Sequence, residues 1–314
     1  MSSSSLITFA SPRVKIGRGI PLFVDEPNTL AELFVQAAKK HERIDALRYK
    51  RNGEWHSISS SDVLRRAGNI ALGLDSIGIN KNDRVAILAP NSPEWTLTDA
   101  GCQFAGIIDV PIYTTLGPSS VAYILNDSGA RILFLDNTAT YDRISDALKN
   151  CPAIEKVVFF ESDTNRSHGS IDLNTLESMG EDARSGNPER LGALQQAVQP
   201  DDVATLIYTS GTTGEPKGVM LTQTNIISNV IDAGEKYSFS EDDVSLSVLP
   251  LSHIFERSAM YLYIFNGMSV NYAESVEKVP DNLKEVRPTI FVGVPRIFEK
   301  VYEKAKLKAA QTGG

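Results

Sequence analysis

"RVAILAPNSPEWTLTDAGCQFAGIIDVPIY", residues 84–113, contains the change of pattern that decides the fold. The apolar run RVAILAP predicts a buried strand, because it is short, continuous and followed by turn-forming residues. Ser92 and Pro93 are the residues preferred at the N-cap and the first turn of a helix, and Gly106 is a preferred stop. A second apolar run, IIDVPIY, predicts another buried strand. The stretch therefore predicts a strand–helix–strand unit.

The same alternation extends in both directions along the chain. Residues 29–40 open with Thr29 and Glu32 in capping-box spacing and predict an amphipathic helix. Residues 61–76 predict a second helix, with Gly78 as its stop. Downstream, SSVAYILNDSG and YDRISDALKN predict helices, and RILFLD and KVVFF predict strands. Because strands and helices alternate, the expected fold class is α/β, with mainly parallel sheets covered by helices on both faces.

The second half of the chain repeats this α/β pattern. Strands are expected from VATLIY, VMLT, VSLSVLPL and PTIFVGV, with a helix at residues 225–236 and a lysine-rich helical pattern at the end. Between the halves, residues 161–200 are rich in Ser, Asp, Asn and Gly, and predict a surface excursion or linker with at most a short helix, in which His168 is solvated. The expected organisation is a first α/β subdomain at residues 1–160, this linker, and a second, truncated subdomain at residues 201–314.

Composition and charge argue against several classes of protein. The chain has 314 residues, 42% hydrophobic and 22% charged, which is ordinary for a globular protein. Its formal net charge of −8 argues against a protein that binds nucleic acid by broad neutralisation of phosphates. Cys102 and Cys151 are the only cysteines and lack the spacing of a metal site. Since no apolar run reaches the roughly 18 residues of a membrane span, we expect a soluble, cytoplasmic protein, with peripheral membrane contact left open.

The segment YTSGTTGEPKGV, residues 208–219, is poor in packing atoms and rich in groups that bind anions. Gly211, Gly214 and Gly218 permit positive φ angles and a close approach of backbone N–H groups to a ligand. The hydroxyl groups that would add donors belong to Thr209, Ser210, Thr212 and Thr213. Lys217 supplies a mobile positive charge. Together these groups suit a polyphosphate.

Two other interpretations of this segment fit less well. A Walker loop requires Ser or Thr and a helix after the lysine, whereas Lys217 is followed by Gly218 and an expected strand. A plain hairpin turn accounts for the glycines, but it leaves the run of hydroxyls and the lysine behind a proline unexplained.

YTSGTTGEPKGVMLTQTN resembles the phosphate-binding signature of the adenylate-forming enzymes, which include acyl-CoA synthetases, luciferases and the adenylation domains of peptide synthetases. Gln223 stands where members of this family usually carry histidine. Residues 83–136 and the segments LPLSHIFER and VGVPRIFEKVYEK are similar to the long-chain fatty acid–CoA ligase branch, in the same order. The resemblance extends from about residue 20 onward and is to the N-terminal portion of such enzymes.

This resemblance implies a reaction and roles for single residues. The reaction is ATP-dependent activation of a long-chain fatty acid to an acyl-adenylate, with release of pyrophosphate and transfer of the acyl group to the thiol of coenzyme A. Residues 209–218 would hold the β- and γ-phosphates, Lys217 would neutralise the leaving pyrophosphate, and Thr212 would lie nearest Mg²⁺. Spacing alone favours a structural role for His253, whereas the resemblance places it at the acyl end of the site.

Four further points stay open from the residues alone. Glu256 and Arg257 either pair with each other or with solvent, or contribute to the site. Strand IFVGV with Pro295 and Arg296 is expected to form a wall of the acyl pocket or part of the plain core. Whether the acceptor is coenzyme A or a carrier protein, and how long the acyl chain is, cannot be read from the residues.

The later motifs of the family are absent from these 314 residues. They are a Tyr-Gly…Thr-Glu segment, a ribose-binding aspartate, the hinge, and a mobile C-terminal domain with its catalytic lysine. We therefore expect the chain alone to be a poor or inactive ligase that exposes a sheet edge, with the missing C-terminal portion as one partner. The alternative from another class is a non-catalytic ATP- or acyl-binding protein.

Overall fold

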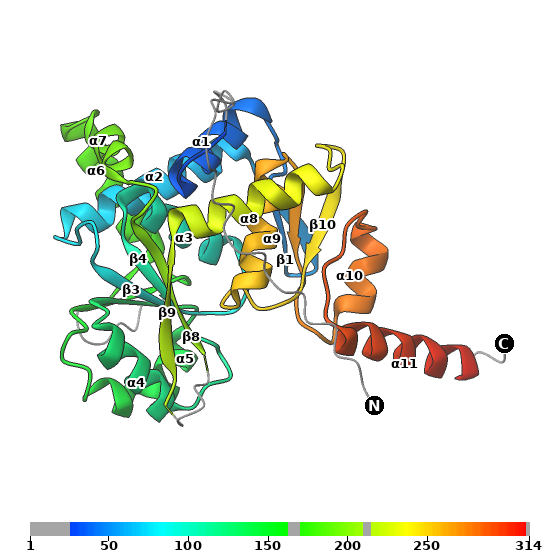
Figure 1. Ribbon diagram of the computed structural model, residues 1–314. Coiled ribbons are helices and arrows are strands. Elements are labelled where there is room, and N and C mark those ends of the chain that lie inside the picture. Colours follow the sequence, from blue (N-terminus) through cyan, green and yellow to red (C-terminus); the bar gives the residue numbers. More distant parts are fainter. Residues whose placement is uncertain (1–25, 163–169, 210–214, 312–314) are drawn as a thin grey trace, which may run out of the picture.

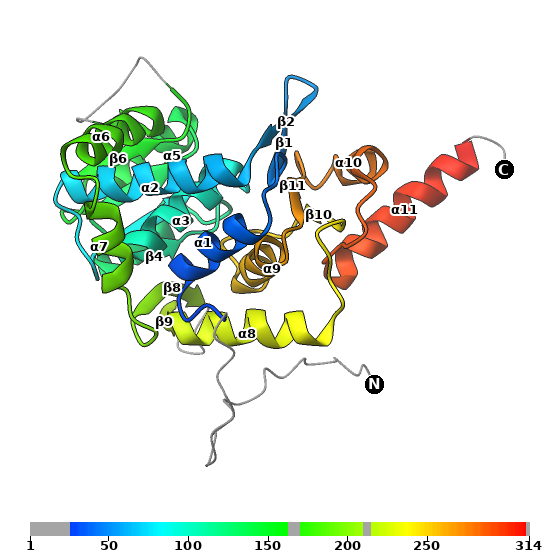
Figure 2. The ribbon, with the colours of Figure 1, turned by 90° about the horizontal axis from the view of Figure 1, so that it is seen from above.

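The computed structural model describes residues 26–162, 170–209 and 215–311, whose strands form two sheets (Figures 1 and 2). The larger sheet has the order β7-β6-β5-β3-β4-β8-β9. Its strands are β3 (Arg84–Leu88), β4 (Ile108–Pro111), β5 (Ile132–Leu135), β6 (Lys156–Phe159), β7 (Ile171–Asp172), β8 (Val203–Thr209) and β9 (Lys217–Thr222). Every neighbouring pair is parallel except β8 and β9, which are antiparallel. The mainly parallel α/β sheet expected from the sequence is confirmed.

The smaller sheet combines strands from the two ends of the chain. Its order is β10-β11-β1-β2, with β1 (Leu47–Arg51), β2 (Glu54–Ile58), β10 (Val244–Ser247) and β11 (Ser269–Tyr272). Strand β11 runs parallel to both β10 and β1, while β1 and β2 form an antiparallel hairpin. Asn52 and Gly53 at the hairpin turn both have positive φ, as an Asn-Gly turn between twisted strands requires.

Helices cover both faces of the larger sheet, as expected. Alternate residues of β3 enter different cores, with Val85 beside residues of α2 and α3, and Ala86 beside residues of α4 and α5. The helices are α1 (Leu30–Lys40), α2 (Ser60–Ser76), α3 (Pro93–Ala105), α4 (Pro118–Ser128), α5 (Thr138–Leu148), α6 (Leu173–Gly186), α7 (Arg190–Ala197), α8 (Gln223–Lys236), α9 (Ile254–Phe265), α10 (Val279–Val286) and α11 (Pro295–Gln311). Helix α11 extends away from the rest of the described chain (Figure 2).

The local signals of the strand–helix–strand unit act as the sequence predicts. The Ser92 hydroxyl accepts a hydrogen bond from the Trp95 N–H, 3.1 Å away, and so caps α3. Gly106 ends α3 in the left-handed conformation with φ 65°. At α1, Thr29 is the N-cap, but the Glu32 carboxylate accepts from the N–H of Asn28 instead of completing a capping box with Thr29.

Residues 173–197 correct the expectation of a surface linker with at most a short helix. They form α6 and α7, and Leu173 and Leu176 of α6 are buried against α2. Helices α6 and α2 approach so closely that a Cβ on Gly180 of α6 would lie 1.8 Å from the carbonyl oxygen of Asn69 on α2. Leucines and one glycine at helical spacing within a polar segment therefore make a packed helix pair that composition alone does not reveal. His168 lies outside the described residues.

Two more expectations change with the structure. PTIFVGV forms no strand, and only Ile290 makes an isolated parallel bridge, to Ser245. The expected subdomain boundaries do not separate the sheets either, because β1 pairs with β11, and β8 pairs with β4. Among the described helices, none is long and apolar enough to cross a membrane.

Candidate functional site

The carboxyl ends of strands from both sheets meet around one pocket of about 190 Å³. Its polar lining includes Asn91 after β3, Thr114 and Thr115 after β4, Ser247 and Ser252 at and after the end of β10, and Glu274 after β11. Ligands of open α/β sheets bind outside the carboxyl ends of parallel strands, where successive connections diverge. The pocket is therefore the best-placed binding site in the described chain.

The predicted phosphate loop starts at the same edge of the larger sheet. Thr209, the last residue of β8, is the cross-strand partner of Lys217 at the start of β9, so residues 210–216 connect the two strands. Strand β8 runs parallel to β4, with Thr205 beside Asp109. Thr209, at the carboxyl end of β8, therefore lies at the same edge of the sheet as the carboxyl end of β4, which leads into the pocket. Thr209 and Lys217 are both exposed. The remaining expected phosphate ligands, Ser210, Gly211, Thr212, Thr213 and Gly214, lie outside the described residues.

Tyr208 and Gly218 form the base of this loop. The Tyr208 hydroxyl donates a hydrogen bond to Asp127 on α4, with 2.6 Å between the oxygens. Its ring lies over Gly218, where an added Cβ would come within 3.1 Å of the ring. Gly218 has no positive φ, which corrects one of the two reasons expected for this glycine. Its missing side chain makes room for the tyrosine, so that α4 holds the end of β8 in place.

His253 is the N-cap of α9 and is exposed. Its Nδ1 accepts a hydrogen bond from the Phe255 N–H at 3.1 Å, so in the neutral ring the proton resides on Nε2. The His253 backbone N–H donates to the carbonyl of Pro250, which lines the pocket. The structure thus places His253 directly after the pocket wall, with Nε2–H as its available donor.

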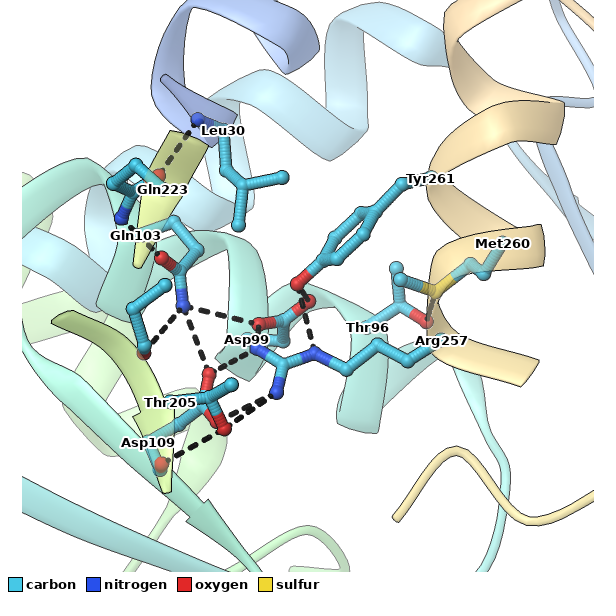
Figure 3. Close-up of polar contacts among 11 residues, drawn as sticks. Leu30, Thr96, Asp99, Gln103, Asp109, Thr205, Gln223, Arg257, Met260 and Tyr261 are labelled. Carbon is cyan, nitrogen blue, oxygen red and sulfur yellow. Dashed lines mark hydrogen bonds and ion pairs between the residues drawn. The ribbon is translucent and has the colours of Figure 1, made fainter. Parts of the chain in front are cut away.

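Arg257, one turn further along α9, is fully buried and pairs with neither Glu256 nor solvent (Figure 3). Its guanidinium donates to Asp109 on β4 at 2.7 Å and to Asp99 on α3 at 2.5 Å. It also donates to the Thr205 hydroxyl on β8 at 2.9 Å. Burial raises the pKa of Asp99 to about 7, although Arg257 opposes the rise. One side chain therefore joins α9 to the larger sheet.

Two glutamines extend this buried cluster to α1 (Figure 3). Gln103 donates to the Asp109 carboxylate at 2.8 Å. The side-chain amide of Gln223 donates to the side-chain oxygen of Gln103, Oε1, at 2.8 Å and accepts from the backbone N–H of Leu30 at 2.8 Å. The position where the resembling family usually carries histidine is thus occupied by a side chain that donates and accepts at once.

Glu256, in the first turn of α9, is also buried and does not itself line the pocket. Burial raises the pKa of its carboxyl group to about 7, while the facing Ser247 side chain and Val248 backbone lower it. Its Oε2 atom has no hydrogen-bond partner among the described residues. The carboxyl group is therefore held partly protonated near neutral pH, behind two residues that line the pocket.

Sequence reasoning missed Asn91, Asp99, Asp109 and Thr205. Asn91 follows a predicted strand, and a polar residue at that place was a usable signal for a ligand crevice. Asp99 and Asp109 stood inside apolar stretches, where a carboxylate requires a buried cation. Pro295 and Arg296, expected as a pocket wall, are exposed at the start of α11 and do not line the pocket.

The described residues contain no group of three or more His, Cys, Asp or Glu side chains that could hold a metal ion. The expected Mg²⁺ ligand Thr212 lies outside them. The described residues therefore show no complete Mg²⁺ site, and Thr212 as a ligand stays a prediction.

Comparison with known proteins gives one consistent result. The AMP-binding enzyme family matches residues 34–313. The mouse long-chain-fatty-acid–CoA ligase ACSBG1 is 34% identical, over 98% of this chain and 43% of that protein. The Mycobacterium tuberculosis long-chain-fatty-acid–CoA ligase FadD15 is 31% identical, over 93% of this chain and 48% of that protein.

Solved structures show the same fold. The Archaeoglobus fulgidus long-chain-fatty-acid–CoA ligase FadD1 superposes with a TM-score of 0.77 at 22% identity, over 93% of this chain and 56% of that one. The N-terminal domain of FACL13 from Mycobacterium tuberculosis gives 0.70 at 24% identity, over 87% of this chain and 64% of that one. The chain thus spans a little under half the length of the curated relatives above. Because the family match extends over most of its residues, the chain belongs to the AMP-binding enzyme family.

Proposed function

We propose that this chain forms the N-terminal part of an enzyme that activates a long-chain fatty acid with ATP and passes the acyl group to coenzyme A. The observation that carries the proposal is that the loop after β8 starts at the same sheet edge as the pocket, which takes residues from both sheets. The names of the relatives supply the substrate class. A cytoplasmic location, with peripheral membrane contact left open, goes with this proposal.

The reaction needs little covalent chemistry from the protein and much positioning. A carboxylate oxygen of the fatty acid attacks the α-phosphorus of ATP, the bond to the β-phosphate oxygen breaks, and pyrophosphate leaves with the electron pair. The thiol sulfur of coenzyme A then attacks the acyl carbon, AMP leaves, and the thiol proton is released. In both steps negative charge develops on phosphate oxygens, so placed N–H, hydroxyl and ammonium groups stabilise the transition state.

We propose roles for single residues, which the family resemblance suggests. Residues 209–218 bind the β- and γ-phosphates, and Lys217 neutralises charge on the departing pyrophosphate. Thr212 is the proposed Mg²⁺ ligand; the ion, when bound, would screen the phosphate charges. His253, with Nε2–H available, donates a hydrogen bond to the acyl carboxylate before attack.

The decisive experiment measures ATP binding and ATP–pyrophosphate exchange by the purified chain, with palmitate as the acid. We expect the chain to bind ATP and to exchange slowly or not at all, because positioning groups that act as a unit lose most of the rate when some are missing. The double variant Thr212→Ala, Lys217→Ala should lose ATP binding, whereas Lys149→Ala, at the exposed C-cap of α5, should not. Wild-type protein that is folded and binds no ATP would contradict the proposal.

Two other outcomes separate the alternatives. Exchange with palmitate that depends on Lys217 shows that these residues alone hold a working adenylation site. ATP binding with no exchange, even after addition of the C-terminal half of a relative such as FadD15, favours a non-catalytic ATP-binding protein. A carrier-protein acceptor is distinguished from coenzyme A by which thiol consumes the adenylate.

A further inference from the structure

Asn91 follows β3 of the larger sheet and makes three hydrogen bonds to the end of β10 in the smaller sheet and to the segment after it. Its Nδ2 donates to the Leu249 carbonyl oxygen at 2.7 Å and to the Ser247 hydroxyl at 3.2 Å. Its Oδ1 accepts from the Leu251 N–H at 2.8 Å. The bonds reach Ser247 at the end of β10 and residues 249 and 251 just after it, about 160 positions away in the sequence.

The backbone that carries Asn91 is fixed. Asn91 stands between the end of β3, in the middle of the larger sheet, and Ser92, the N-cap of α3. Prolines precede and follow this pair of residues, at positions 90 and 93, which restricts the backbone further. The amide is therefore presented from a rigid part of the larger sheet.

The segment that Asn91 holds has no regular structure of its own. Residues 248–252 connect β10 to α9 and include Pro250 and Ser252 of the pocket wall. The next residue is His253, whose N–H is bonded to Pro250 within the same segment. Since an irregular segment takes its shape from the bonds that others make to it, Asn91 sets where this wall and His253 stand relative to the larger sheet.

We infer that Asn91 is a positioning residue: its amide holds residues 248–252, and through them His253, against the sheet edge from which the phosphate loop starts. The inference rests on the proposed function for its consequence, which is that Asn91 governs binding of the acyl substrate more than binding of ATP. The reason is that Thr209 and Lys217 belong to strands of the larger sheet, while His253 follows β10 of the smaller one.

The test uses the full 314-residue chain and two variants of Asn91. Asn91→Ala removes all three bonds. Asn91→Asp keeps the size and the acceptor for Leu251, but loses both donors and sets a carboxylate against the Leu249 carbonyl. Asn271→Ala is the matched control, because Asn271 is a buried amide of the smaller sheet that donates to Ser245 and lines no part of the pocket.

The first measurement is hydrogen–deuterium exchange of the peptide that covers residues 248–256. We expect protection of this peptide to fall in both Asn91 variants and to be kept in Asn271→Ala. Protection of the strands of the larger sheet should be unchanged in all three variants. Unchanged protection of this peptide in a folded Asn91→Asp protein overturns the inference, whatever the chain binds.

The second measurement is equilibrium binding of palmitate and of ATP. We expect roughly tenfold weaker palmitate binding in the Asn91 variants, with ATP binding changed by less than about twofold. Equal loss of both ligands, or palmitate binding as in wild type, overturns the positioning role in the site. Wild-type protein that binds neither ligand instead refutes the proposed function, and the exchange measurement still decides whether Asn91 holds the segment.

Discussion

Arg257 on α9 and Asp109 on β4 form a fully buried ion pair, with 2.7 Å between Nη1 and Oδ1. The pair joins α9, whose N-cap is His253, to the strand that leads into the pocket. Because Thr205 shares both partners, the strand that ends at the phosphate loop is tied to the same point. The two walls of the proposed site are thereby held by one cluster.

Removal of Arg257 should therefore destabilise the whole fold. Arg257→Ala leaves Asp99 and Asp109 buried without a cation, and we expect the free energy of unfolding to fall by about 3–5 kcal/mol. The control is Arg65→Ala, whose partner Asp62 is about half exposed, with an expected cost below about 1 kcal/mol. Urea denaturation followed by circular dichroism measures both, and equal costs for the two variants would contradict the assigned role.

The buried carboxyl groups predict that stability falls as pH rises through neutrality. Burial raises the pKa of Asp99 and of Glu256 to about 7 each, above their values in the unfolded chain. The folded state thus binds more protons, and this contribution is complete below about pH 4 and lost as pH rises through 7. For Glu256 the loss between pH 5 and 8 is about 2 kcal/mol.

Glu256→Gln isolates one of these groups. The amide keeps the size of the side chain and cannot ionise, so its free energy of unfolding should exceed that of wild type at pH 8 and match it at pH 5. The matched substitution Glu285→Gln, at the exposed partner of Lys50, should leave the slope of stability between pH 5 and 8 unchanged. A wild-type slope retained in Glu256→Gln means that Glu256 does not carry the effect.

The close contact between α6 and α2 predicts that an added side chain at Gly180 destabilises the fold. A methyl group at Gly180 would meet the Asn69 carbonyl at 1.8 Å, so Gly180→Ala should cost roughly 3 kcal/mol or more, since the backbones must separate. Gly192 of α7 has nothing within 4 Å of an added Cβ, and Gly192→Ala should stabilise the helix by about 0.5–1 kcal/mol. Thermal unfolding of both variants checks the opposite signs.

Local pattern predicted the larger sheet except for the short strand β7, but of the smaller sheet it predicted only β10. Each βα unit is contiguous, and its ends carry short-range signals such as the Ser92 cap and the positive φ of Gly106. The parallel pairing of Leu47 with Val270 has no local signal, because the pairing is decided by burial across the whole molecule. The dipeptide Asn52-Gly53 at the turn of the β1–β2 hairpin is one local signal in the smaller sheet, since Asn-Gly favours a two-residue hairpin turn.

The site shows the same division. Thr209 and Lys217 lie in a motif with a distinctive spacing, so their place on either side of a loop was predictable. His253 was singled out only by the resemblance, because its spacing alone favours a structural role, and the functional roles of all three stay predictions. Asn91 and Arg257 were not predictable, since what they do depends on partners about 150 residues away, and only the folded chain brings those together. A hydrogen bond between distant segments leaves no periodicity in the sequence.

Gln223 gives the last prediction, because the resembling family usually has histidine at this position. A neutral imidazole can also accept from the Leu30 N–H with one nitrogen and donate to Gln103 with the other, so Gln223→His should fold with nearly wild-type stability at pH 8. An imidazolium has no acceptor, and burial disfavours its charge, so the pKa of the introduced ring should be lowered below its usual value. The variant should then lose stability relative to wild type as pH falls below that ring's unfolded pKa of about 6.5. Gln223→Leu, which neither donates nor accepts, should cost about 1–3 kcal/mol at every pH. Paired urea titrations at pH 5 and 8 separate the variants, and a histidine variant insensitive to pH would show that the bond to Leu30 is not needed.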